Sequence, residues 1–146
     1  MPMSSVTIPS SLEQAQPAEV VRWAADTFGI DGLAVTASFE DAVLVHVAAT
    51  AVPGIEITLL DTQYLFAETR WLVEELTRSL SLNLRVIHPL ADIAPDNRWQ
   101  TDVEGCCHVR KVEPLNRALG GKQGWITGVR RADGPTRANA PVAAYD

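Results

Sequence analysis

Two adjacent cysteines, Cys106 and Cys107, are the residues of this sequence best suited to do chemistry. Neighbouring thiolates can each bind a different iron of one cluster, whereas zinc motifs place two or more residues between their cysteines. His108, Arg110 and Lys111 follow immediately, and positive charge beside a thiol favours the thiolate form that binds metal. Two small buried apolar side chains are the plain structural alternative. The pair therefore predicts half of a metal-cluster site.

The composition is that of a soluble globular protein with one domain. The chain has 146 residues, of which 47% are hydrophobic and 21% are charged, so it can bury a substantial core. It contains no apolar run as long as a membrane span, and its first residues do not resemble a secretory signal. Adjacent cysteines do not form the disulfide framework of a secreted scaffold. We therefore expect a cytoplasmic protein that does not enter a membrane.

The charges are divided unevenly along the chain. Residues 1–97 hold 13 acidic and 4 basic side chains, and residues 98–146 hold 5 acidic and 8 basic ones. A protein that is acidic as a whole is a poor candidate for coating nucleic acid. A basic sector on an acidic body favours a small anionic ligand, although a solvated basic surface would give the same counts.

Helical and strand-like segments alternate after a short tail. Residues 1–16 are rich in Ser, Pro and Gln without a period, which predicts a flexible tail. The domain then spans residues 17–146. Strands are predicted at 33–37, 55–60, 84–87 and 125–129, with a fifth beginning at 142–145, and helices at 17–28, 42–51, 66–80 and 109–119, with Pro114 as a kink or restart. The polar stretch 91–105 predicts a loop or lid.

This alternation predicts an α/β fold, a doubly wound and mostly parallel sheet with helices on both faces, truncated at its fifth strand. Ligands of such sheets bind at the carboxyl ends of the strands. Ser38 follows the first predicted strand, Asp61 and Thr62 follow the second, and Arg130 and Arg131 follow the fourth.

Ser38 and the first N–H groups of the next helix could hold a phosphate, and the two arginines could bind its oxygens. A helix cap, a turn and a solvated surface are the structural alternatives for these residues. Their coincidence at one edge of the sheet favours an anionic nucleotide site. The sequence has neither G-x-x-x-x-G-K-[ST] nor a G-x-G-x-x-G after a strand, which excludes the two commonest phosphate-binding loops.

Four blocks of sequence point to one family. Residues 60–69 read L-D-T-Q-Y-L-F-A-E-T, residues 104–115 read E-G-C-C-H-V-R-K-V-E-P-L, residues 128–131 read G-V-R-R, and residues 136–141 read T-R-A-N-A-P. In this order they resemble the L-D-T-G-Y-x-F-x-E-T, E-x-C-C-x-x-R-K-x-x-P-L, G-x-R-R and R-A-N-x-P segments of assimilatory adenylyl-sulfate reductases. The resemblance runs from about Ala18 to the last residue. One departure is Gln63, which stands where the family has a glycine.

The resemblance implies an adenine-nucleotide α-hydrolase type of fold. It also implies reduction of adenylyl sulfate to sulfite and AMP, with thioredoxin as electron donor, in sulfate assimilation toward cysteine. Cys106 and Cys107 would be ligands of a four-iron four-sulfur cluster, which phosphoadenylyl-sulfate reductases lack, and Lys111 would lie between the cluster and the substrate sulfate. The substrate-binding residues would be Ser38, Asp61, Thr62, Lys111, Arg130 and Arg131.

Two further segments of the family do not occur in these 146 residues. One is a C-x-x-C that completes the cluster, and the other is a terminal E-C-G-[LI]-H that supplies the nucleophilic cysteine. We therefore expect two of four cluster ligands and no nucleophile in this chain, with Lys111 as an electrostatic helper. A homo-oligomer would supply two more ligands.

Several interpretations stay open at this point. The chain is the N-terminal portion of an adenylyl-sulfate reductase, a short form that binds adenylyl sulfate or AMP without reducing it, a phosphoadenylyl-sulfate reductase, or a vicinal-thiol module that senses redox state or metal.

Overall fold

A computed structural model describes residues 6–40, 42–63, 65–90, 98–128 and 133–145. Within them, parallel strands form one sheet in the order β3-β2-β1-β4. The strands are β1 (Leu33–Thr36), β2 (Glu56–Leu60), β3 (Asn83–Ile87) and β4 (Gly124–Thr127). The chain moves outward from β1 to β3 and then returns to the other side of β1. The point at which this order reverses therefore lies between β1 and β4.

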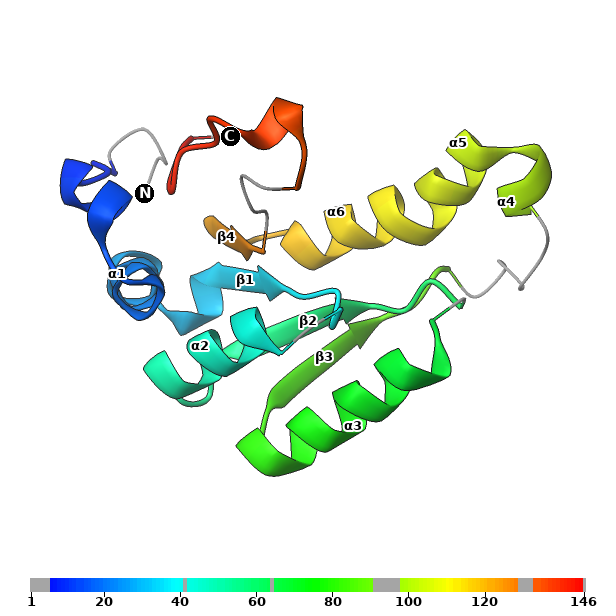
Figure 1. Cartoon of the computed structure of the whole chain (residues 1–146), viewed down its shortest axis with the longest axis horizontal. Helices are drawn as coiled ribbons and strands as arrows, with labels where there is room; N and C mark the ends of the chain where they lie inside the picture. Colours follow the sequence, from blue (N-terminus) through cyan, green and yellow to red (C-terminus); the bar gives the residue numbers. More distant parts are fainter. Residues whose placement is uncertain (1–5, 41, 64, 91–97, 129–132, 146) are drawn as a thin grey trace.

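Helices cover both faces of this sheet. They are α1 (Pro17–Phe28), α2 (Val43–Ala51), α3 (Ala67–Leu80), α4 (Arg98–Thr101), α5 (Val103–Cys107) and α6 (Glu113–Leu119), with shorter helical turns at η2 (Ser10–Gln14), η3 (Ile30–Gly32) and η6 (Pro135–Arg137). Helices α2 and α3 lie on one side of the sheet and α6 on the other (Figure 1). The predicted α/β fold, with a parallel sheet between two layers of helices, is confirmed.

Most of the predicted elements lie within a few residues of their expected positions. Helix α1 begins at Pro17, whose fixed φ suits a first turn. It ends at Phe28, and the next residue, Gly29, caps it with a φ of 76° and donates its N–H to the carbonyl of Ala25. Within the stretch predicted as a tail, residues 10–14 form η2, and Leu12 is buried.

The prediction of a loop at 91–105 is wrong for its described part. Helix α4 and the beginning of α5 lie there, and Asp102 caps α5 by accepting a hydrogen bond of 3.0 Å from the Gly105 N–H. Such a cap satisfies an N–H group that has no partner within the helix. The helix predicted from 109 onward begins with a π-helical segment, η4 (His108–Val112), and restarts as α6 with Pro114 in its first turn.

Residues 142–145, where we expected a fifth strand to begin, form no strand. The Val142 N–H instead donates to Oε1 of Glu13, at 2.8 Å. The Tyr145 hydroxyl similarly bonds the carbonyl of Val6. This end of the described chain therefore lies against the N-terminal segment, and the Val142 N–H bonds a side chain there instead of a neighbouring strand.

The two faces of the sheet differ in polarity. Side chains alternate along a strand, and the face toward α2 and α3 carries the apolar core, including Val35 and Ile57, both 0% exposed. The opposite face carries Thr36 and Thr58, which are neighbours in register. Helix α6 packs against β2 and β3 on that side. The sheet therefore has one ordinary apolar face and one unusually polar face.

Replacing Thr58 by valine should raise the free energy of unfolding by about 1 kcal/mol, because a buried hydroxyl without a partner is costly. Thr58 is 1% exposed, and among the described residues its Oγ1 has no hydrogen-bond partner. Thermal unfolding of T58V measures the change. The matched control is T36V on the same face, which removes an acceptor used by Trp125 and should lower stability. A T58V protein less stable than the parent would contradict this account.

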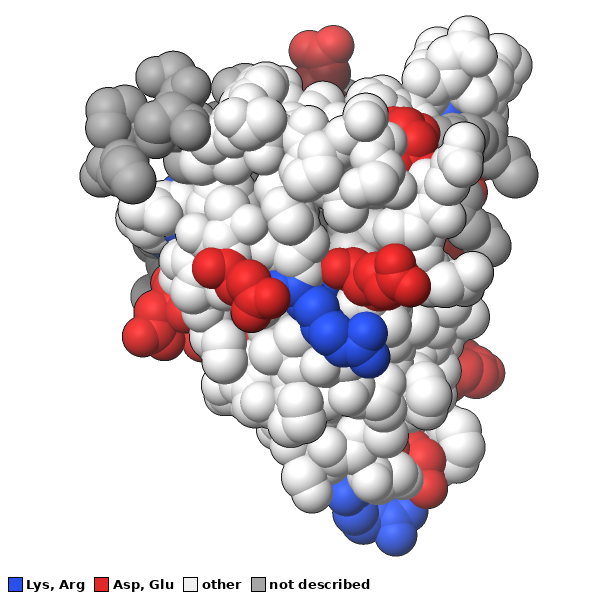
Figure 2. All heavy atoms as spheres, turned by 90° about the vertical axis from the view of Figure 1, so that its left-hand side faces the viewer, with Lys and Arg blue, Asp and Glu red and all other residues white. Residues whose placement is uncertain are grey.

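The surface around α1 has mixed charge. Figure 2 shows acidic and basic side chains close together on that face, with uncharged residues over most of it. It lacks the continuous basic patch that typifies nucleic-acid binding. Within the described residues, no helix is both long and apolar enough to cross a membrane.

Candidate functional site

A cavity of about 920 Å³ lies at the carboxyl ends of β1, β2 and β4. Its position is the one that the reversal of strand order predicts for a ligand, and its volume suits a ligand of nucleotide size. Residues from three strand ends, the first turns of α2, the η4–α6 segment and the 133–137 segment line it. They include Thr36, Ser38, Glu40, Val43, Leu44, Leu59, Thr62, Lys111, Leu115, Trp125, Thr127, Gly128, Asp133 and Arg137.

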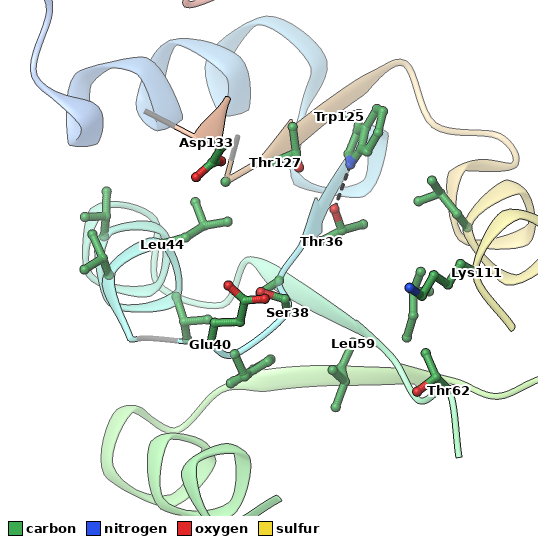
Figure 3. A pocket seen from close by; sticks show the side chains of 18 of the residues that line it. Thr36, Ser38, Glu40, Leu44, Leu59, Thr62, Lys111, Trp125, Thr127 and Asp133 are labelled. Carbon is green, nitrogen blue, oxygen red and sulfur yellow. Dashed lines mark hydrogen bonds between the residues drawn. The ribbon is translucent and has the colours of Figure 1, made fainter. Parts of the chain in front are cut away.

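Three residues predicted from the sequence meet in this cavity. Ser38 follows β1, Thr62 follows β2, and Lys111 lies on η4 with its ammonium directed into the cavity (Figure 3). The π-helical segment that carries Lys111 is a rare geometry that often occurs at functional sites. Two hydroxyls and one cation on separate elements can bind the oxygens of an anionic ligand.

Asp61 lies at the same edge of the sheet, but it is not among the residues that line the cavity. Its Oδ1 accepts a hydrogen bond of 2.8 Å from the Gln63 N–H, and its Oδ2 lies 3.5 Å from Nδ1 of His88. Gln63 has a φ of 73°, a left-handed conformation that glycine adopts most easily. The backbone therefore keeps here a geometry suited to the glycine that Gln63 replaces.

Arg130 and Arg131 fall outside the described residues. They follow β4 by a few positions, and Gly128, just before them, lines the cavity. Their predicted role in binding a ligand therefore stays a prediction.

Several cavity residues were not singled out by the sequence reasoning. Trp125 on β4 donates from Nε1 to Oγ1 of Thr36 on β1, at 2.8 Å, which ties the two strands together where the order reverses. Glu40, Asp133 and Arg137 add charge to the lining. For Glu40, Asp133 and Arg137 the available signal was positional, because each lies in or near a segment that leaves the carboxyl end of a predicted strand. Trp125 begins a predicted strand and carried no such signal.

The cysteine pair lies at the end of α5, directly before η4. Cys106 is a partly buried free thiol, and its N–H donates to the carbonyl of Asp102 at 2.9 Å. A four-iron cluster usually needs four cysteine ligands, and the sequence contains two cysteines. Within the described part of the chain, no group of three or more Cys, His, Asp or Glu could hold a metal. The described residues therefore complete no such ligand set.

The fold and the cavity together define an α/β protein with a candidate ligand site where its strand order reverses. Comparison with known proteins is more specific, since the phosphoadenosine phosphosulfate reductase domain matches residues 32–146. The chain belongs to this family.

Its curated relatives include adenosine 5′-phosphosulfate reductases. The protein of Streptomyces coelicolor is 40% identical, over 92% of this chain and 59% of its own length. That of Rhodococcus erythropolis is 38% identical, over 92% and 61%. The chain thus spans about 60% of the length of these relatives. A crystal structure of phosphoadenylyl-sulfate reductase from Candida auris, a phosphate complex, has the same fold, with a TM-score of 0.71 at 23% identity over 86% of this chain and 70% of that one.

Proposed function

We propose that this chain is the nucleotide-binding portion of a cytoplasmic enzyme that reduces adenylyl sulfate to sulfite and AMP, with thioredoxin as electron donor, in sulfate assimilation toward cysteine. The observation that carries the proposal is the cavity at the β1–β4 reversal, where Ser38, Thr62 and Lys111 converge in a member of this family. The names of the similar curated proteins support adenylyl sulfate as the substrate.

The ligand chemistry fits the groups that line the cavity. The Lys111 ammonium is a compact charge that attracts sulfate and phosphate oxygens, and the hydroxyls of Ser38 and Thr62 donate hydrogen bonds to them. Arg130 and Arg131, which follow β4, would add bidentate contacts. Asp61 would act on the ligand only indirectly, through the turn that it forms with Gln63. The apolar lining is suited to the nucleoside.

The reaction breaks the bond between sulfur and the bridging oxygen of the mixed anhydride. AMP leaves with that oxygen, the sulfur takes up two electrons to become sulfite, and the dithiol of thioredoxin becomes a disulfide with loss of two protons. A cysteine that attacks the sulfur would lie in the part of the relatives that this chain does not span. Lys111 would stabilise charge on the sulfate while the bond breaks.

Cys106 and Cys107 are the residues that we propose as two ligands of a four-iron four-sulfur cluster. The described residues complete no such set, and the reaction above involves no step at a cluster. Pairing of two copies of the chain would bring four cysteines together.

The purified 146-residue chain should bind adenylyl sulfate and AMP but release no sulfite from adenylyl sulfate and reduced thioredoxin, because both of its cysteines are assigned to the cluster. At a ligand concentration about 100 times the Kd, binding should stabilise the fold by about 2.7 kcal/mol. A thermal-shift titration and a sulfite assay measure the two effects, with GMP as the control nucleotide. Sulfite release would contradict the expected lack of reduction, and a melting temperature that neither adenine ligand changes would contradict nucleotide binding.

A further inference from the structure

The segment of residues 133–145 brings charge to the cavity but has little burial of its own. Asp133 and Arg137 line the cavity, and both are exposed. None of residues 133–145 is buried. The turn η6 is closed by the Arg137 N–H, which donates to the carbonyl of Gly134 at 3.0 Å, but a single turn does not fix where the segment lies. Contacts with other parts of the chain therefore decide whether Arg137 stays at the cavity, because a segment with few buried contacts opens easily.

The N-terminal segment supplies such contacts. The Val142 N–H donates to Oε1 of Glu13 on η2, at 2.8 Å, and the Tyr145 hydroxyl bonds the carbonyl of Val6. These partners are 129 and 139 positions apart in the sequence. Figure 1 shows the end of the described chain coming back beside the N-terminal turn. The two ends of the described chain are therefore joined by hydrogen bonds next to the segment that carries Arg137.

The turn that carries Glu13 is itself anchored in the fold. Leu12, its neighbour, is 6% exposed, and the Ala15 N–H donates to the carbonyl of Leu12 at 3.2 Å. The chain then enters α1, from which Val21 and Ala24 pack into the hydrophobic core. Glu13 is exposed, but its carboxylate extends from a fixed point of the backbone. A hydrogen bond to an ionised acceptor is among the stronger ones in proteins.

We propose that Glu13 is a positioning residue for the nucleotide cavity. By accepting the Val142 N–H, its carboxylate holds residues 133–145 against the N-terminal segment and keeps the Arg137 guanidinium at the cavity, where it attracts an anionic ligand. Glu13 lies outside residues 32–146, the stretch that the family domain matches, so the cavity depends on a residue that this domain does not include. The proposal rests on the proposed function, because it takes the ligand to be an adenine nucleotide.

Glu13→Ala should weaken the binding of AMP by the 146-residue chain at least about fivefold, because apparent affinity falls with the fraction of molecules that keep the competent conformation. Calorimetry measures the dissociation constants. Loss of a negative charge alone would favour an anionic ligand, so the sign of the effect separates positioning from net charge. Glu13→Gln keeps the acceptor oxygen and should stay within about twofold of the parent. Glu19→Ala, at an exposed residue in the first turn of α1, is the matched control and should also stay within about twofold.

A double-variant cycle tests whether Glu13 acts through Arg137. In an Arg137→Ala background, adding E13A should weaken AMP binding by less than about twofold, because the guanidinium that Glu13 keeps in place is already absent. A purely structural role of Glu13 would give the same loss in both backgrounds. Thermal unfolding without ligand checks that each variant is folded.

The assignment of Glu13 is overturned, while the proposed function stands, if E13A binds AMP as the parent does, if E13Q loses as much affinity as E13A, or if the full loss persists beside R137A. Should E13A fail to fold, Tyr145→Phe takes its place, because it releases the same segment from its other hydrogen bond. Y145F should weaken AMP binding at least about threefold, and unchanged affinity overturns the proposal. If the folded parent chain binds no AMP, both the proposal and the proposed function are overturned.

Discussion

Replacing Lys111 by glutamate should weaken the binding of adenylyl sulfate by about 100-fold, or roughly 2.7 kcal/mol at room temperature. Lys111 is the residue on η4 whose ammonium points into the cavity. Its substitution removes an attraction and introduces a repulsion toward the same sulfate and phosphate oxygens. The side chain is exposed, so the fold should tolerate the change, and thermal unfolding without ligand should be close to that of the parent.

The size of this effect should depend on the ligand. If Lys111 lies nearest the sulfate, K111E will weaken adenylyl sulfate more than AMP, which lacks that group. Equilibrium titration with both ligands gives the two ratios. Lys122→Glu makes the same charge change at a residue that donates to the carbonyl of Asp31 and does not line the cavity, so it should alter affinity by less than about threefold. Equal losses in the two variants would mean that only the net charge matters.

The sequence predicted those parts of the fold that depend on apolar patterning. Val35 and Ile57 are completely buried and lie in short, mostly apolar runs. Such runs alternate with helical spacing, which leaves few arrangements other than a parallel sheet. The position of the cavity follows from that topology. Ser38 and Thr62 could be placed for the same reason, since each lies two residues after the end of a strand.

Other features depended on contacts that no local pattern records. Arg110 was expected only to supply charge near the cysteines, yet it is 1% exposed and buried within η4. The polar stretch before the cysteines looked like a loop, but Asp102 stabilises a helix there with a single cap. The Asp61 carboxylate accepts a hydrogen bond from the Gln63 N–H and does not line the cavity. Sequence spacing alone does not show which hydrogen-bond partner this side chain has.

The contact between β1 and β4 gives the second large prediction, because a glycine is required there. Gly124 is paired with Leu33 across the two strands. A Cβ at position 124 would lie 2.7 Å from Cδ2 of Leu33 and 2.8 Å from Cδ2 of Phe28. Leu33 is 1% exposed, so the packed core leaves it little room to move.

Gly124→Val should therefore lower the free energy of unfolding by about 2–3 kcal/mol, as is typical of an overpacked core. Chemical denaturation measures it. Gly134→Val is the control, because its backbone is extended and a Cβ there would meet nothing within 4 Å. A similar loss in both variants would show that the contact with Leu33 is not responsible.

A double variant isolates the contact itself. Leu33→Ala alone should destabilise the chain by about 2–5 kcal/mol, because it leaves a hole in the core. In Gly124→Val combined with Leu33→Ala, the valine occupies part of that hole. The sum of the losses in free energy of unfolding of the two single variants should therefore exceed the loss in the double variant by at least about 1 kcal/mol. The same strand pair carries Thr36 and Trp125 into the cavity, so G124V should also weaken nucleotide binding. The double variant should recover part of that affinity, which would link this packing contact to the geometry of the site.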